Sequence, residues 1–179
     1  MKDDSVTAVA RKPWNKGKIV GQKPPLKQQD VWAIRIRLQM SNQVRELAMF
    51  NLAIDSKLRS CDLLALRVQD VTRGGHVLKR AMIIQQKTHH PVQFELTSQT
   101  REAVGKWIQH AGLAESDYLF PSRIKCRPHL STRQYARIVD SWFTAIGLDP
   151  SEYGTHSLRR TKAALIYRRT KIFEWYSCC

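Results

Sequence analysis

The sequence predicts an α+β domain, mainly α-helical with a small antiparallel β-sheet. Apolar residues recur at spacings of three and four over most of the chain, which is the pattern of helices with one buried face. Between residues 68 and 96 this pattern gives way to β-branched runs around a Gly-Gly turn, which is typical of short strands. With 179 residues, 42% of them hydrophobic, the chain is long enough for one domain with a buried core.

The expected elements follow one another from Lys27. Helices are expected over 27–40, 43–56 and 60–66. Strands are expected over 68–72, 81–86 and 92–96, with a turn at Gly74 and Gly75 and a hairpin tip near residue 87. Helices resume over 100–110, 131–146 and 155–171, and three aromatic residues on their faces are expected in the core: Trp107, Trp142 and Phe143.

The net charge of the chain indicates what kind of partner it binds. The chain carries 30 Lys and Arg against 15 Asp and Glu, a net charge of +15. Such an excess favours a polyanionic partner, and a nucleic acid is expected rather than a membrane. No apolar stretch is long enough for a membrane span, and the first residues lack the pattern of a signal peptide, so a cytoplasmic protein is expected.

The N-terminal residues predict a basic arm. Residues 5–29 contain no acid, and glycine and proline interrupt them. Residues 1–25 are therefore expected to form a flexible arm or linker that follows a phosphate backbone, with an affinity that falls as salt rises. The candidate DNA-binding residues of this arm are Arg11, Lys12, Lys16, Lys18 and Lys23.

The four cysteines do not indicate a disulfide framework. Cys61 falls in an apolar helical pattern and is expected to be buried, and Cys178 and Cys179 are adjacent and cannot easily pair with each other. A zinc site with Cys126 and His129, or with the histidines at 89 and 90, would lack a closing pair of ligands at the usual spacing. No metal site and no cofactor are expected.

Residues 155–171 combine a helix with a pair of residues suited to phosphate. Leu158 and Leu165 stand seven residues apart, so they face the same side of the predicted helix. His156 and Arg159 stand three apart and lie on neighbouring parts of one helix face. Arginine presents a planar fork of donors that matches two phosphate oxygens, and histidine exchanges a proton near neutral pH. A His-x-x-Arg pair alone is common by chance. The prediction that His156 and Arg159 act on a phosphate therefore depends on two further segments upstream.

Those segments are 56–67, SKLRSCDLLALR, centred on Arg59, and 86–91, QKTHHP, centred on Lys87. Together with THSLRRT at 155–161, they resemble the catalytic domain of the tyrosine recombinases, the phage-integrase family of DNA strand-exchange enzymes. The resemblance covers 26–171 and implies the fold of that catalytic domain.

The resemblance also implies residue roles. In the family a tyrosine attacks the scissile phosphate and becomes covalently linked to DNA, without a cofactor. Arg59 and Arg159 would stabilise the negative charge of the transition state, and Lys87 would protonate the leaving hydroxyl. His156 would support proton transfer or hold a phosphate oxygen. Asp62, three residues after Arg59, is expected to pair with Arg59 and fix its orientation.

Two departures from the family pattern matter. Lys57 and Asp62 replace a glycine and a glutamate of the first arginine segment, and both changes are tolerable. Residues 172–179 form an atypical tail, and Tyr176 lies 17 residues after Arg159, far closer than the nucleophile of the family. No residue of this sequence is therefore expected to be the nucleophile.

Several functions remain open at this point. The main expectation is an integrase or site-specific recombinase catalytic domain that binds DNA but cannot cleave it unaided. A tyrosine donated by another subunit would restore cleavage, so intact recombinase subunits or a homo-oligomer are possible partners. The alternatives are a non-catalytic DNA-binding regulator of recombination sites and a defective, frameshifted integrase remnant. A type IB topoisomerase is a weaker choice, because the rest of the chain resembles integrases.

Overall fold

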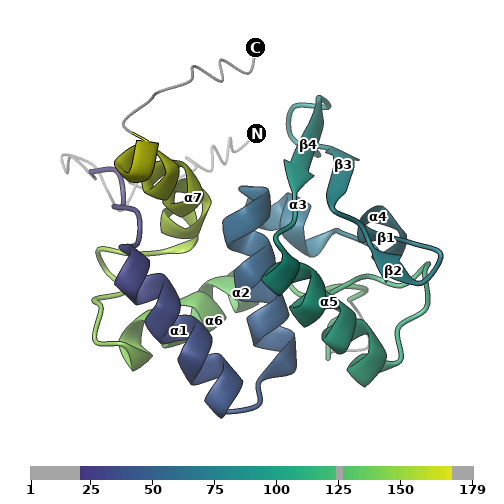
Figure 1. Ribbon diagram of the computed structural model, residues 1–179, viewed down its shortest axis with the longest axis horizontal. Helices are drawn as coiled ribbons and strands as arrows, with labels where there is room; N and C mark the ends of the chain where they lie inside the picture. The colour runs from purple at the N-terminus through teal and green to yellow at the C-terminus, as the bar shows by residue number, and fades with distance from the viewer. Residues whose placement is uncertain (1–20, 124–126, 171–179) are drawn as a thin grey trace, which may run out of the picture.

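The computed structural model describes residues 21–123 and 127–170 (Figure 1). The elements in chain order are α1 (Gln28–Met40), α2 (Val44–Ser56), α3 (Ser60–Leu64), α4 (Val68–Val71), β1 (Thr72–Arg73), β2 (His76–Val77), β3 (Arg80–Ile84), β4 (Pro91–Glu95), α5 (Ser98–Ala111), α6 (Thr132–Ala145) and α7 (Thr155–Thr170). The expectation of a mainly helical domain with short antiparallel strands is confirmed.

Helix α2 is the centre of the core. Every residue from Ala48 to Ser56 is buried, because α1, α5 and α7 pack around it. Phe50 is fully buried, and its ring meets that of Trp142 edge to face at 5.4 Å between centroids. Such pairs of aromatic rings contribute beyond the apolar area that they bury. The chain leaves α2 through Lys57 and enters α3, so the carboxyl end of this rigid helix positions the residues that follow.

The strands form two separate two-stranded antiparallel sheets, where one small sheet was expected. Gly74 and Gly75 join β1 to β2 with φ angles of 58° and 79°. Positive φ at both central residues fits a tight hairpin turn and favours glycine. In the second sheet Arg80 lies opposite Glu95 and Ile84 lies opposite Pro91, which leaves residues 85–90 as the hairpin tip.

The predicted strand over 68–72 is wrong, because Val68–Val71 forms the short helix α4. The carboxylate of Asp70 accepts a hydrogen bond from the Arg67 backbone N–H at 2.7 Å, which caps the helix start. The Val68 amide also donates to the Asp117 carbonyl oxygen at 2.9 Å. These contacts outweigh the strand preference of two valines.

Helices α5 and α6 match their predictions closely. The Thr97 and Ser131 side chains accept hydrogen bonds from backbone N–H groups in the first turns of α5 and α6. Gly147 adopts a φ of 80° just after α6 and ends that helix, as expected. Trp142 and Phe143 are buried, and Trp107 is partly buried against the same core.

Residues 21–26 pack against α7 instead of standing free, which corrects the expectation for Lys23. Its ammonium donates to the backbone carbonyl oxygens of Pro150 and Tyr153, in the loop before α7. Leu26 is fully buried, and its N–H donates to Thr161 Oγ1 at 3.1 Å. Lys23 is thus a structural contact. The other candidate residues of the basic arm lie outside the described residues: Arg11, Lys12, Lys16 and Lys18.

Candidate functional site

Arg59 stands at the start of α3, where its backbone is extended and forms the N-cap. Lys57 ends α2 in the left-handed conformation, with a φ of 56°, and turns the chain sharply. Leu58 between them is buried in the core. The expectation that Arg59 sits at a helix entrance is confirmed. Its Nη1 donates to Gln85 Oε1 at 2.9 Å, so the guanidinium is tied to the end of strand β3.

Asp62 does not form the expected pair with Arg59. Its side chain is buried, and Oδ1 accepts a hydrogen bond from the Gln86 backbone N–H at 2.9 Å. Within the described part of the chain, Oδ2 has no hydrogen-bond partner. The first turn of α3 points Asp62 toward the hairpin while Arg59 lies at the cap. Asp62 therefore holds the residue before Lys87 and fixes the start of the hairpin tip.

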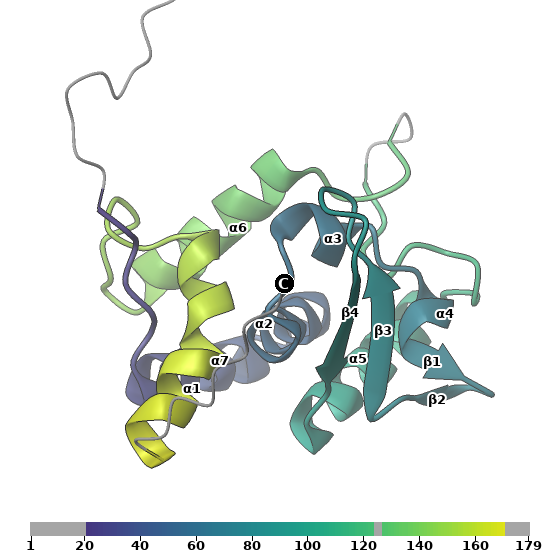
Figure 2. The ribbon, with the colours of Figure 1, turned by 90° about the horizontal axis from the view of Figure 1, so that it is seen from above.

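Lys87 lies at the tip of the β3–β4 hairpin, as expected. The tip is closed by backbone hydrogen bonds from Gln85 N–H to the His90 carbonyl oxygen and from His89 N–H to the Gln85 carbonyl oxygen. Thr88 Oγ1 also donates to Gln85 Oε1 at 2.7 Å. Figure 2 shows this tip beside α3. The Lys87 side chain is exposed on a tip that is anchored at its base.

His156 and Arg159 come from the first turns of α7, which packs against α2. Leu158 and Thr161 are buried, and Leu165 packs partly against the core, so the predicted inward face is confirmed. Arg159 Nε donates to the Lys57 backbone carbonyl oxygen at 2.8 Å, two residues before Arg59. His156 is exposed one helical turn before Arg159.

A buried polar network holds α7 in place. Asp55 accepts hydrogen bonds from the Thr97 N–H at 2.8 Å and from Thr100 Oγ1 at 2.7 Å, both through Oδ2. Its Oδ1 lies 3.3 Å from Lys162 Nζ. Lys162 follows Arg159 by three residues, so this ion pair joins α7 to α2 next to the Arg159 contact.

Short contacts thus link the segments that carry Arg159, Arg59 and Lys87. Arg159 reaches the carbonyl that precedes Arg59, Arg59 reaches Gln85, and Asp62 holds the residue before Lys87. Arg159 therefore reaches the end of α2 next to Arg59, while Lys87 is exposed on the hairpin tip and His156 is exposed one turn before Arg159. This arrangement offers several donors to one phosphate group.

Sequence reasoning missed Gln85 and the Asp55–Lys162 pair. A signal for Gln85 was present, because a strand period of two places it on the same face as the buried Ala81. A glutamine at an inward position of a strand needs a polar partner. The pairing of Asp55 with Lys162 depends on how α7 crosses α2, which no local pattern specifies.

Residues 21–123 and 127–170 contain no group of three or more His, Cys, Asp or Glu placed to hold a metal ion. Cys126, considered for a zinc site, lies outside the described residues, and Cys61 is half-buried. None of the described helices has the length and apolar character to span a bilayer.

Comparisons with known proteins identify the family and the fold. "Probable integrase/recombinase YoeC" of Bacillus subtilis (strain 168) is 30% identical over 132 residues, which are 74% of this chain and 68% of that protein. The crystal structure of XerA recombinase superposes with a TM-score of 0.69 at 18% identity, covering 84% of this chain and 53% of that one.

A lambda integrase dimer bound to a COC′ core site gives a TM-score of 0.61 at 18% identity, covering 84% of this chain and 42% of that one. The chain thus spans about half the length of these solved recombinases. Their likeness shows the tyrosine recombinase catalytic-domain fold. Residues 25–170 match the Phage integrase family, and the chain belongs to that family.

Proposed function

We propose that residues 26–171 act as the catalytic domain of a site-specific recombinase and hold the scissile phosphate of double-stranded DNA. The observation that carries the proposal is the hydrogen bond from Arg159 to the Lys57 carbonyl, because it brings α7 to the end of α2 where Arg59 begins α3. The net charge of +15 supports DNA as the partner. We propose further that the protein is cytoplasmic and associated with DNA, and that it is of bacterial or phage origin.

The proposed chemistry is phosphoryl transfer to a tyrosine. The tyrosine hydroxyl gives up its proton to water and its oxygen attacks phosphorus, the bond to the 5′ oxygen breaks, and Lys87 gives a proton to that leaving oxygen. Arg59 and Arg159 stabilise the negative charge on the non-bridging oxygens. His156 holds one of these oxygens or passes a proton. Asp62 acts indirectly, since it fixes the hairpin that presents Lys87.

We propose further that residues 1–179 bind DNA without forming the covalent link by themselves. The resemblance assigns the nucleophile to no tyrosine of this sequence, and Tyr176 stands too close to Arg159. A tyrosine supplied by another recombinase subunit would complete the site. Residues 1–25 are proposed as a basic arm that adds phosphate contacts, although Lys23 itself is engaged within the domain.

The test is a nicked suicide duplex that carries the recombination site flanking the chain's own gene. We expect a shifted band that weakens as salt rises, and no covalent protein–DNA product on a denaturing gel. A covalent product that disappears in Tyr176→Phe would show that the chain carries its own nucleophile and would overturn the second proposal. Absence of any shifted band in low salt would overturn the first.

Self-association is a further part of the proposal. Ile166 on α7 is 51% exposed, and Trp32, Ile36 and Met40 form an exposed stripe along α1 at spacings of four. Exposed apolar stripes of this kind favour contact with another chain. We expect the weight-average mass in sedimentation to rise with concentration. A mass that stays at that of one chain at every concentration would contradict this part.

A further inference from the structure

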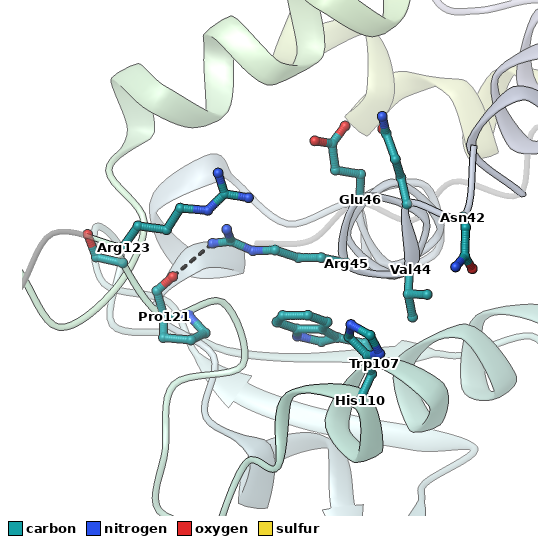
Figure 3. Close-up of a pocket in the computed structure, with 10 residues that line it drawn as sticks. Asn42, Val44, Arg45, Glu46, Trp107, His110, Pro121 and Arg123 are labelled. Atoms are coloured by element: carbon teal, nitrogen blue, oxygen red, sulfur yellow. Dashed lines mark hydrogen bonds between the residues drawn. The ribbon is translucent and has the colours of Figure 1, made fainter.

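A second basic site lies at the far end of α2 from Arg59. A cavity of about 360 Å³ opens between the first turn of α2, the C-terminal half of α5 and residues 121–123 (Figure 3). A helix rises about 1.5 Å per residue, so α2 separates the cavity from Arg59 by roughly 20 Å. The cavity is therefore distinct from the site proposed for the scissile phosphate.

Two arginines reach toward each other across this cavity. Figure 3 shows the Arg45 side chain extending from α2 toward that of Arg123, above the ring of Trp107. Arg45 Nη2 donates to the Pro121 backbone carbonyl oxygen at 2.8 Å. Its Cζ lies 5.8 Å from the centroid of the Trp107 ring. These contacts hold the Arg45 guanidinium in one place at the cavity wall.

The cavity has an excess of positive charge. Among the described residues, no carboxylate forms an ion pair with Arg45 or Arg123. Burial lowers the pKa of Arg45, and the nearby charge of Arg123 lowers this pKa further, while Glu46 opposes the change. Glu46 is engaged elsewhere, since its Oε2 accepts a hydrogen bond from Trp142 Nε1 at 2.6 Å. An anion between the two guanidinium groups would remove their repulsion.

Two further features suit an anion. His110 lines the cavity from α5 beside Trp107, and a neutral or protonated imidazole can donate a hydrogen bond. Helix α2 begins at the cavity, and its N-cap residue Gln43 makes no side-chain hydrogen bond to the first turn. The positive end of the α2 dipole therefore adds to the charge of the two arginines.

We propose that this cavity binds a phosphate group, held by Arg45, Arg123 and His110 against the Trp107 ring. Guanidinium groups match the geometry of phosphate oxygens, and their charged hydrogen bonds are among the stronger ones in proteins. The phosphate belongs either to a small free molecule or to a DNA backbone, and the chemistry of the cavity is the same for both. The inference stands independently of strand exchange at Arg59.

The test uses the full chain, labelled with ¹⁵N, and inorganic phosphate at constant ionic strength. The indole N–H of Trp107, assigned with Trp107→Phe, donates to the Leu119 carbonyl oxygen at 2.7 Å and belongs to a ring that lines the cavity. Because this ring lies at the far end of α2 from Arg59, its resonance distinguishes phosphate in the cavity from phosphate bound at Arg59 or Arg159. We expect this resonance to shift and to saturate in the millimolar range. A shift that does not saturate, or no shift, would overturn the proposal.

Matched variants identify the residues. Arg123 is exposed, so Arg123→Gln should leave the fold intact, and we expect it to weaken phosphate binding about ten-fold. Arg133→Gln removes the same charge from an exposed position on α6 and should leave binding unchanged. Equal weakening in both variants would show a general effect of charge and would overturn the site. Arg45→Gln is less decisive, because it also removes the contact with Pro121.

A second arm distinguishes the sources of phosphate. A short DNA duplex is added in phosphate-free buffer while the Trp107 resonance is followed. If DNA moves this resonance in the wild type and not in Arg123→Gln, a backbone phosphate occupies the cavity. If only inorganic phosphate moves it, the cavity takes a free phosphate or a small phosphorylated molecule. Both results support the phosphate site and assign its source.

Discussion

Helix α2 leads into Arg59 and helix α7 carries His156 and Arg159, but the two helices are held by different kinds of contact. The whole C-terminal two thirds of α2 is buried, whereas α7 buries only Ser157, Leu158 and Thr161 among its described side chains. Helix α7 instead depends on directed polar contacts, chiefly Lys162 with Asp55 and Arg159 with the Lys57 carbonyl. Packing fixes one half of the site, and a few polar contacts fix the other half. Local stability should therefore be lower in α7 than in α2.

The largest effect is expected from Phe50→Ala in α2. Phe50 is fully buried and meets Trp142, so its loss leaves a cavity and should lower the free energy of unfolding by about 3–5 kcal/mol. Ile166→Ala on the exposed face of α7 is the control and should change it by less than about 0.5 kcal/mol. Urea denaturation followed by circular dichroism measures both. Similar losses of unfolding free energy in the two variants would contradict the view that α2 is held by packing more than α7 is.

Lys162→Met is expected to have the next largest effect. It leaves the Asp55 carboxylate, 4% exposed, without its cation, and we expect a loss of about 2–3 kcal/mol because the Lys162 side chain is only 24% exposed. Lys106→Met on the exposed side of α5 is the matched control. Amide hydrogen exchange should accelerate in α7 and stay slow in α2. Acceleration in both helices alike would mean that α7 is not held separately.

A smaller effect is expected from Asp62→Ala. The Gln86 amide loses its acceptor, which should cost about 1–2 kcal/mol and speed exchange of that amide with solvent. Asp62→Asn retains an acceptor oxygen and should preserve the protection of Gln86. If Asp62→Asn loses as much protection as Asp62→Ala, the carboxylate charge matters more than the hydrogen bond. In the same variants, the exchange rate of the Gln86 amide can be compared with the rates of the α7 amides, which shows whether the hairpin is more rigid than α7.

The smallest effect concerns pH. Hydrogen bonding and charge from Arg80 hold the pKa of Glu95 below its ordinary value, at an exposed position of the β3–β4 sheet. A carboxyl with a lowered folded-state pKa stabilises the fold above its unfolded pKa, and this contribution is lost as pH falls through the folded value. Arg80→Gln should return the pKa of Glu95 toward normal in an NMR titration. Stability near neutral pH should hardly change, because an exposed ion pair contributes little.

The sequence predicted the elements with strong local signals. Helix α6 was expected over 131–146 and forms between a serine cap and a glycine stop, which are features of the chain itself. Residues 68–71 were expected to form a strand but form helix α4. This prediction failed because the carbonyl groups that hold the helix belong to a distant loop, at Glu115 and Asp117. Local propensity could not reveal those partners.

In the candidate site, too, the features with a local sequence signal were predicted and those that depend on distant contacts were not. Arg59, Lys87, His156 and Arg159 could be chosen from motifs, whereas Gln85, which accepts the hydrogen bond from Arg59, lies outside those motifs. Asp62 was expected to face Arg59, but the direction of a side chain in a one-turn helix depends on which element packs beside it. Lys23 was assigned to a free arm from composition alone, which carries no information about the carbonyl groups near α7.

The Arg159 contact uses the main-chain oxygen of Lys57, and this choice has a genetic consequence. Every amino acid supplies that oxygen, so single substitutions at position 57 should leave the acceptor in place, and Lys57→Gly should relieve the cost of its positive φ of 56°. Inserting or deleting one residue between α2 and α3 would instead displace the oxygen. A saturation library should therefore show position 57 as tolerant of most residues other than proline and the β-branched ones, and as intolerant of any change in length.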